Sequence, residues 1–236
     1  MRADAGSARR SPAWWNHQRH VLVGLRRAIE TLLRDSIHLK PGEHVVDLGC
    51  GERPYEPLFL DRGALYIACD LEGDGVVPLV PGKLTPLKDG SADGVASFQV
   101  LEHVWDLDWY LKEAHRLLKP GGWLLLSTHG AWLYHPHPTD YRRWTRDGLV
   151  KELETRGFEV QAVSAVVGPL AWTTQFRLLG IREALLKVPL LGRGASFLVA
   201  IVMNLRMAVE DRMTPAAIRE VNASLYVTLS RKPLSS

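Results

Sequence analysis

The chain has 236 residues, of which 46% are hydrophobic and 23% are charged, and its formal net charge is +3. This length and composition predict one globular domain with a sizeable core, and so weak a positive charge gives no support for a nucleic-acid partner. The two cysteines, Cys50 and Cys69, have neither metal-site nor disulfide-framework spacing, so we expect a reducing, cytoplasmic setting.

The N-terminal residues contain no apolar core of the secretory type. Residues 1–13 are small or charged and are followed closely by two tryptophans, so we predict a disordered tail there and a single domain over residues 14–236. Apolar positions recur at helical spacing between Trp14 and Ile37, which predicts the first helix of that domain.

Short apolar segments then alternate with helical patterns along most of the chain. Asp106 is a plausible helix cap, and Gly157 stands at the end of a later helix. Such alternation indicates an α/β fold whose sheet is mostly parallel and covered by helices on both faces. The predicted strands are 44–49, 64–70, 75–80, 93–99, 123–128, 158–167 and 223–231, and the predicted helices are 14–37, 106–118, 145–158 and a helical insert at 169–222.

The sequence HVVDLGCGERPY, residues 44–55, places a glycine turn directly after the first strand. Gly49 and Gly51 remove side chains where a ligand approaches the backbone, and Asp70 follows at the end of the second strand, where a carboxylate binds ribose hydroxyls. This spacing is typical of nucleoside cofactors. A dinucleotide needs a third glycine, but Arg53 and Pro54 occupy that region, so the pattern favours S-adenosylmethionine.

At this point the sequence resembles the class I S-adenosylmethionine-dependent methyltransferases, the type 11 group in particular. VVDLGCG and IACD are similar to the first two cofactor motifs, and DGSADGVASFQVLEHV and EAHRLLKPGGWLLLST to the later ones. The resemblance implies a Rossmann-like sheet of seven strands with an antiparallel last strand. It also implies a cofactor site for S-adenosylmethionine, which we place at Asp47, Gly49, Gly51, Asp70, Leu71, Gln99 and Leu101.

Histidines gather after the fourth and fifth predicted strands, beside the expected methyl group. A neutral imidazole suits general-base work near neutral pH, and we select His129 or His135 for this role. His135, His137 and Asp140 offer a rival metal site, but two prolines stiffen the loop and no fourth ligand is evident, so we expect no metal. The expected substrate pocket consists of Glu102, His103, His137, Tyr141 and Trp14.

We therefore predict an enzyme that methylates a small-molecule or glycan-like acceptor, at oxygen, in polysaccharide or secondary-metabolite biosynthesis. The resemblance of the PTDYRRWT loop to enzymes of such pathways favours this reading. The alternatives are a non-catalytic nucleoside-binding or scaffold protein with the same fold, and a nicotinamide oxidoreductase. Residues 170–209 are expected to form a lid, a homodimer interface or a membrane-surface contact, and the sequence leaves these three roles open.

Overall fold

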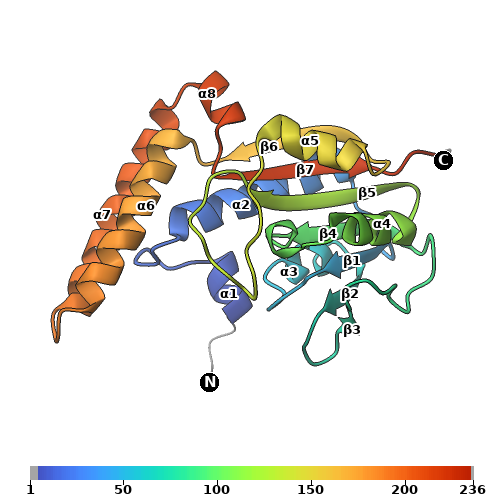
Figure 1. Ribbon diagram of the computed structural model, residues 1–236, viewed down its shortest axis with the longest axis horizontal. Helices are drawn as coiled ribbons and strands as arrows, with labels where there is room; N and C mark the ends of the chain where they lie inside the picture. Colours follow the sequence, from blue (N-terminus) through green and yellow to red (C-terminus); the bar gives the residue numbers. More distant parts are fainter. Residues whose placement is uncertain (1–4, 235–236) are drawn as a thin grey trace.

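Seven strands form one sheet in the order β3-β2-β1-β4-β5-β7-β6 (Figure 1). The computed structural model describes residues 5–234. Parallel pairing joins neighbours from β3 to β5, whereas β7 lies antiparallel between β5 and β6, which confirms the predicted Rossmann-like fold. The strands are β1 (His44–Leu48), β2 (Leu65–Asp70), β3 (Val77–Pro78), β4 (Ala92–Phe98), β5 (Leu118–His129), β6 (Glu159–Val166) and β7 (Leu225–Arg231).

Helices cover both faces of this sheet because its strands are apolar on both sides. In β1, Val45 packs into one hydrophobic cluster and Val46 into the other, as the two-residue period of a strand requires. Burying one such side chain stabilises the fold by about 1.5–3 kcal/mol. The first cluster includes side chains of α2 (Arg19–Leu32), η1 (Leu33–Ile37) and α3 (Glu56–Leu60), and the second those of α4 (Leu107–Leu117) and α5 (Arg146–Glu154).

Three element boundaries differ from the sequence prediction. A short helix, α1 (Ala5–Arg10), occupies part of the predicted disordered tail, and residues 1–4 lie outside the described residues. The expected helix from Trp14 instead begins with α2, so both tryptophans precede it. The third strand is only two residues long, and Pro78 at its end has no N–H to continue the ladder.

The insert after β6 forms a helical hairpin that projects from the end of the sheet (Figure 1). It consists of α6 (Pro169–Leu186) and α7 (Gly192–Met213), and α8 (Ala216–Val221) leads into β7. Among the described residues, α7 is the one helix that is long and apolar enough, by length and composition, to cross a membrane. Only 28% of its 18-residue apolar stretch is buried inside the protein. The hairpin therefore leaves much apolar surface without a partner inside the chain.

Candidate functional site

The turn between β1 and α3 bends where two glycines take positive φ angles, +76° at Gly49 and +52° at Gly51. A Cβ atom on Gly49 would come within 2.6 Å of the Val100 side chain, so this position has no room for one. A Cβ on Gly51 would meet nothing within 4 Å. Because Gly51 lines a cavity, its missing side chain leaves the backbone open to a ligand.

Asp70 ends β2 beside this turn, since β1 and β2 are neighbouring parallel strands. Its Oδ2 accepts the backbone N–H of Gly51 at 2.6 Å, and its Oδ1 accepts the N–H of Leu71 at 2.7 Å. These two bonds fix the carboxylate at the cavity wall. Each oxygen keeps a second lone pair, so the carboxylate can still accept hydrogen bonds from a pair of hydroxyl groups.

Arg53 stands where the third glycine of a dinucleotide site would be and itself takes a positive φ of +52°. Its guanidinium donates to the carbonyl oxygens of Asp74 and Gly75, at 2.8 and 3.0 Å. The side chain therefore clamps the loop after β2 and does not line the cavity. This geometry shows how the turn keeps its shape without the third glycine.

Asp47, in β1, is a buried carboxyl group on the cavity wall, with an exposed fraction of 2%. Its Oδ2 accepts a hydrogen bond from the Tyr66 hydroxyl at 2.5 Å, whereas its Oδ1 has no partner. Burial raises the pKa of Asp47 to about 7, and the Tyr66 hydrogen bond offsets part of that rise. A cationic group entering the cavity would stabilise its charged form.

One cavity of about 720 Å³ connects the glycine turn with the ends of β4 and β5. It lies beyond the carboxyl ends of parallel strands, where open α/β sheets bind ligands. Gln99, at the end of β4, takes a positive φ of +58° there and donates from its amide to Ser127 Oγ at 2.9 Å. The predicted site residues that line the cavity are Asp47, Gly49, Gly51, Asp70, Leu71, Gln99, His103, His129, His135, His137 and Tyr141.

Three predicted site residues do not line this cavity, and each has a physical reason. Leu101 and Glu102 lie in η2 (Leu101–His103) with fully buried side chains. The Arg19 guanidinium lies over the Trp14 ring, 4.1 Å from the ring centre. The backbone carbonyl of Trp14 accepts a hydrogen bond from the side-chain amide of Asn204 in α7. We therefore correct the placement of Leu101 in the cofactor wall and of Glu102 and Trp14 in the pocket wall.

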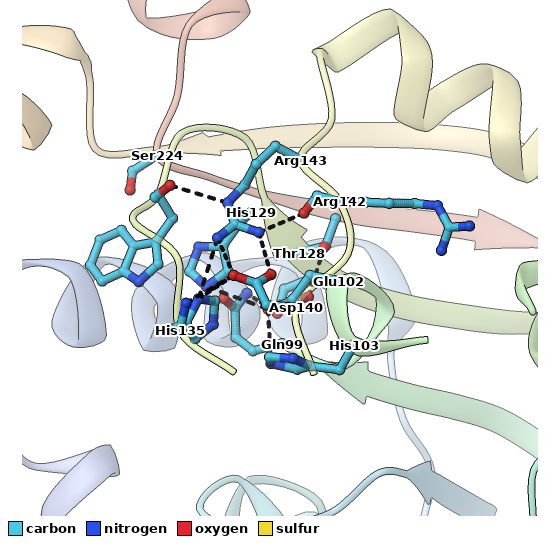
Figure 2. A network of polar contacts seen from close by, with 12 residues as sticks. Gln99, Glu102, His103, Thr128, His129, His135, Asp140, Arg142, Arg143 and Ser224 are labelled. Carbon is cyan, nitrogen blue, oxygen red and sulfur yellow. Dashed lines mark hydrogen bonds and ion pairs between the residues drawn. The ribbon is translucent and has the colours of Figure 1, made fainter. Parts of the chain in front are cut away.

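A cluster of three histidines stands at the other end of the cavity (Figure 2). His129 ends β5, His103 ends η2, and His135 belongs to the loop after β5. The ring centre of His135 lies 4.8 Å from that of His129 and 5.0 Å from that of His103, with both pairs edge to face. Desolvation by burial lowers the pKa of His129 well below its ordinary value and also lowers that of His135.

Glu102 lies beneath the histidine cluster with no exposed surface. Its Oε2 accepts the Thr128 hydroxyl at 2.8 Å. Its Oε1 lies 3.3 Å from His129 Nε2, but the two atoms do not meet in hydrogen-bond geometry and Oε1 has no hydrogen-bond partner. Burial raises the pKa of Glu102 to about 7.

The loop that carries His135 is held by an ion pair within it. Arg143 donates to both carboxylate oxygens of Asp140, at 2.6 and 2.7 Å, and holds the pKa of Asp140 well below its ordinary value. Asp140 in turn accepts the backbone N–H of His135 at 2.9 Å. The loop is tied to η2 because Tyr141 N–H donates to the carbonyl of Glu102 at 2.9 Å.

Other cavity residues escaped the sequence prediction. Trp132 stacks on His129, with ring centres 5.0 Å apart and planes 17° from parallel. Arg9 and Gln18 reach the cavity from α1 and from the residue before α2. We did expect the N-terminal segment at the pocket, but through Trp14, whereas the structure brings Arg9 and Gln18 to the cavity instead.

Comparison with known proteins gives a consistent picture. Residues 15–163, more than half of the chain, match a family model described as a methyltransferase domain. A probable S-adenosylmethionine-dependent methyltransferase of Mycolicibacterium smegmatis is 33% identical over 152 residues, which cover 57% of this chain and 59% of that protein. A ubiquinone biosynthesis O-methyltransferase of Pseudomonas aeruginosa is 32% identical over 106 residues, which cover 37% of this chain and 44% of the relative. The matches thus cover only about half the length of these curated relatives, 59% of the first and 44% of the second.

The crystal structure of the [4+2]-cyclase SpnF has a similar fold, with a TM-score of 0.58 and 18% sequence identity. The match covers 89% of this chain and 82% of SpnF. At this identity the likeness shows the fold alone. A cyclase among the neighbours also illustrates that function has to be argued from the site.

Proposed function

The chain belongs to the methyltransferase domain family, and on this premise we propose that it transfers a methyl group from S-adenosylmethionine to an oxygen of a small-molecule or glycan-like acceptor. One observation carries the proposal. A single cavity joins the glycine turn and Asp70 at one end to His129 and His135 at the other. A cofactor and an acceptor would therefore meet inside the same cavity.

The residues at the first end suit the cofactor. Gly51 leaves its backbone open, Asp70 offers lone pairs to two ribose hydroxyls, and Asp47 on the cavity wall has an unpartnered oxygen that could accept a hydrogen bond from an ammonium group. Bound S-adenosylmethionine would supply a methyl group attached to a positively charged sulfur, and the sulfur would leave when an acceptor oxygen takes the methyl group. The protein's part is to hold the acceptor in line and to take up its proton.

The histidines at the second end suit an acceptor that carries a hydroxyl group. We assign the proton of His129 to Nε2, which lies 3.3 Å from Glu102 Oε1, so that Nδ1, buried and without a partner, can accept the hydroxyl proton. His135 is the second candidate for this role. The acceptor oxygen would lose its proton to the imidazole and gain the methyl group, so that an ether and S-adenosylhomocysteine result.

The acceptor class follows from the size and lining of the cavity. A volume of about 720 Å³ is that of a small-molecule site. Trp105 and Tyr141 lie against each other on its wall, with ring centres 5.2 Å apart, and such rings pack well on the apolar face of a sugar. The O-methyltransferase among the relatives also favours oxygen as the methylated atom.

The proposal extends to the surface on which the enzyme works. On α7, Leu198, Val202, Leu205 and Val209 recur every three or four residues and are each more than half exposed, opposite the buried face of the helix. In residues 5–234, the exposed cations at the hairpin tip, Lys187 and Arg193, form no ion pair, whereas the carboxylates on the hairpin are all paired with basic side chains. This combination of apolar and unpaired basic groups favours an anionic membrane surface over a second copy of the chain.

Calorimetric titration with S-adenosylmethionine and S-adenosylhomocysteine tests the proposal, with NAD as the matched control ligand. We expect both adenosyl ligands to bind and NAD to give no heat. Formation of S-adenosylhomocysteine in the presence of hydroxylated sugars then tests transfer. The absence of binding at millimolar cofactor would favour the scaffold alternative, and binding of NAD alone would favour an oxidoreductase.

A further inference from the structure

The buried carboxylate of Glu102 lacks a cation. Its side chain has no exposed surface, and the Thr128 hydroxyl satisfies only Oε2. Within the described part of the chain, no lysine or arginine donates to Oε1, because the nearby Arg143 is bound by both arms to Asp140. A buried carboxylate oxygen without a donor is costly, so a positive partner from outside the chain would stabilise the charged form of Glu102.

Two histidines turn a free ring nitrogen toward the same place. His103 Nδ1 is hydrogen-bonded to the carbonyl of Thr139, which assigns the proton to Nδ1 and leaves Nε2 with a lone pair. His135 Nδ1 faces two acceptors, the Leu133 carbonyl at 3.1 Å and Asp140 Oδ2 at 3.2 Å, against one donor, Arg143 at 3.3 Å. The two nearer acceptors favour the same tautomer for His135.

From these contacts we propose that Glu102, His103 and His135 bind a divalent first-row transition-metal ion. One ligand atom of each residue lies within 4.8 Å of those of the other two. Such ions bind nitrogen and oxygen ligands at about 2.0–2.2 Å, which places the ligands of one ion roughly 3–4 Å apart. Small side-chain rotations on η2 and the loop after β5 would close the remaining distance.

The hydrogen bonds behind the ligands resemble those of a metal site. A ligating histidine usually donates its other ring N–H to a carbonyl or carboxylate, as His103 does to Thr139 and as His135 does to Leu133 or Asp140. Two imidazoles and one carboxylate, without thiolates, suit Mn²⁺, Fe²⁺, Co²⁺ or Zn²⁺ better than Mg²⁺ or Ca²⁺. The structure thus selects a different set from the loop residues His135, His137 and Asp140 that the sequence suggested.

Three protein ligands leave coordination positions free, and His103 and His135 both line the cavity. This last step rests on the proposed function: the free positions would hold oxygen atoms of the acceptor, and an acceptor with neighbouring hydroxyl groups fits them best. His135 would then serve as a ligand, and the proton acceptor would be His129, which stands outside the three-residue set.

The test uses full-length protein stripped of metal with EDTA and titrated with CoCl₂, while visible absorption reports nitrogen and oxygen ligands. We expect one Co²⁺ per chain, displaced by Zn²⁺. Loss of an outer hydrogen-bond partner alone weakens metal sites by about 10–100-fold, so Glu102→Gln and His135→Ala should each weaken Co²⁺ binding by at least about 100-fold. The matched control is His137→Ala, a cavity histidine outside the set, which should bind Co²⁺ as the unchanged protein does.

His135→Ala guards against misfolding of the Glu102 variant because it lies on a loop, and circular dichroism of both variants checks their folding. Absence of Co²⁺ and Zn²⁺ uptake, or equal affinity in all three variants, would overturn the proposal. Calorimetry with S-adenosylhomocysteine on the metal-free protein distinguishes failure of the metal-site proposal from failure of the proposed function. Cofactor binding without metal uptake refutes the ion alone, whereas loss of cofactor binding in folded protein refutes the methyltransferase proposal.

Discussion

Asp70 Oδ2 accepts the backbone N–H of Gly51 at 2.6 Å across a separation of 19 residues. The bond ties the end of β2 to the glycine turn after β1. A carboxylate that we assign to the cofactor's ribose therefore also fixes the shape of the turn. Removing this carboxylate should therefore both weaken ribose binding and loosen the turn, and different substitutions can separate the two effects.

Asp70→Ala should weaken binding of S-adenosylhomocysteine by about 100-fold, because charge-assisted hydrogen bonds to two hydroxyls are lost together with the support of Gly51. Asp70→Asn keeps one acceptor oxygen and should lose less. Calorimetry measures both affinities, and Asp61→Ala, an exposed residue after α3, is the control. Equal affinity in Asp70→Ala and the control would remove Asp70 from the cofactor site.

The two glycines of the turn should respond differently to alanine. Gly49→Ala brings a Cβ within 2.6 Å of Val100 at a φ of +76°, so it should lower the free energy of unfolding by about 2–4 kcal/mol. Gly51→Ala meets no atom within 4 Å and should cost about 1–2 kcal/mol, from its positive φ alone. Urea denaturation measures both changes.

The Gly51→Ala variant also tests whether the cofactor binds next to this turn, since a methyl group on Gly51 enters the space assigned to the cofactor. We expect Gly51→Ala to reduce the free energy of cofactor binding by more than it reduces the free energy of unfolding. A variant that binds S-adenosylhomocysteine as the unchanged protein does would show that the ligand does not approach this backbone.

Most of the fold was predictable because hydrophobic period and turn residues act locally. Val45 and Val46 identify a strand buried on both faces, and Asp106 caps α4 by accepting the N–H of Trp109 at 3.0 Å, as expected. At residues 5–10 the prediction of a disordered tail differs from the structure, which has α1 there in contact with distant residues. Arg26 of α2, for example, donates to the carbonyl of Arg10 at 3.1 Å, a partnership that composition does not reveal.

The site was predictable where residues follow strand ends and less so elsewhere. Asp70 and His129 line the cavity because parallel strands end at a common edge. Glu102 was placed in the pocket wall, yet the turn of η2 directs it inward to Thr128. No sequence pattern distinguishes those two directions for a residue three positions beyond a strand.

Asp47 predicts a pH dependence of stability. Its pKa rises from 3.8 to about 7 on folding, so between these values the folded protein holds a proton that the unfolded chain has released. The free energy of unfolding contributed by Asp47 therefore falls as pH rises from about 4 to about 7, and then levels off. Asp47→Asn should lack this slope and be more stable at pH 8, by up to about 4 kcal/mol.

Thermal denaturation of the unchanged protein and of Asp47→Asn, from pH 4 to 8, measures the difference in their stability. Taking this difference cancels the contributions of other titrating groups. Asp61→Asn serves as the control because that side chain is exposed. Parallel curves for the unchanged protein and Asp47→Asn would mean that Asp47 is charged in the folded state.

His129 tests the assignment of the proton acceptor. His129→Ala should lower kcat by about 10²–10⁴-fold, the usual effect of losing a general base, while cofactor affinity stays within a few fold. The rate of S-adenosylhomocysteine formation with any hydroxylated acceptor that the unchanged protein methylates is the measurement. His38→Asn, at an exposed position with a positive φ that asparagine tolerates, is the control. Full turnover in His129→Ala would exclude this histidine as the base.

The exposed stripe of α7 predicts association with anionic membranes. We expect the protein to sediment with phosphatidylglycerol vesicles, less so with phosphatidylcholine vesicles or at high salt, because both apolar and basic groups contribute. Replacing Leu198 and Val202 by glutamine should weaken binding at least about tenfold, since each buried aliphatic side chain contributes roughly 1.5–3 kcal/mol. Leu60→Gln changes an exposed leucine on α3 and is the control. A concentration-independent dimer in light scattering, together with no vesicle binding, would assign the stripe to a second copy of the chain instead.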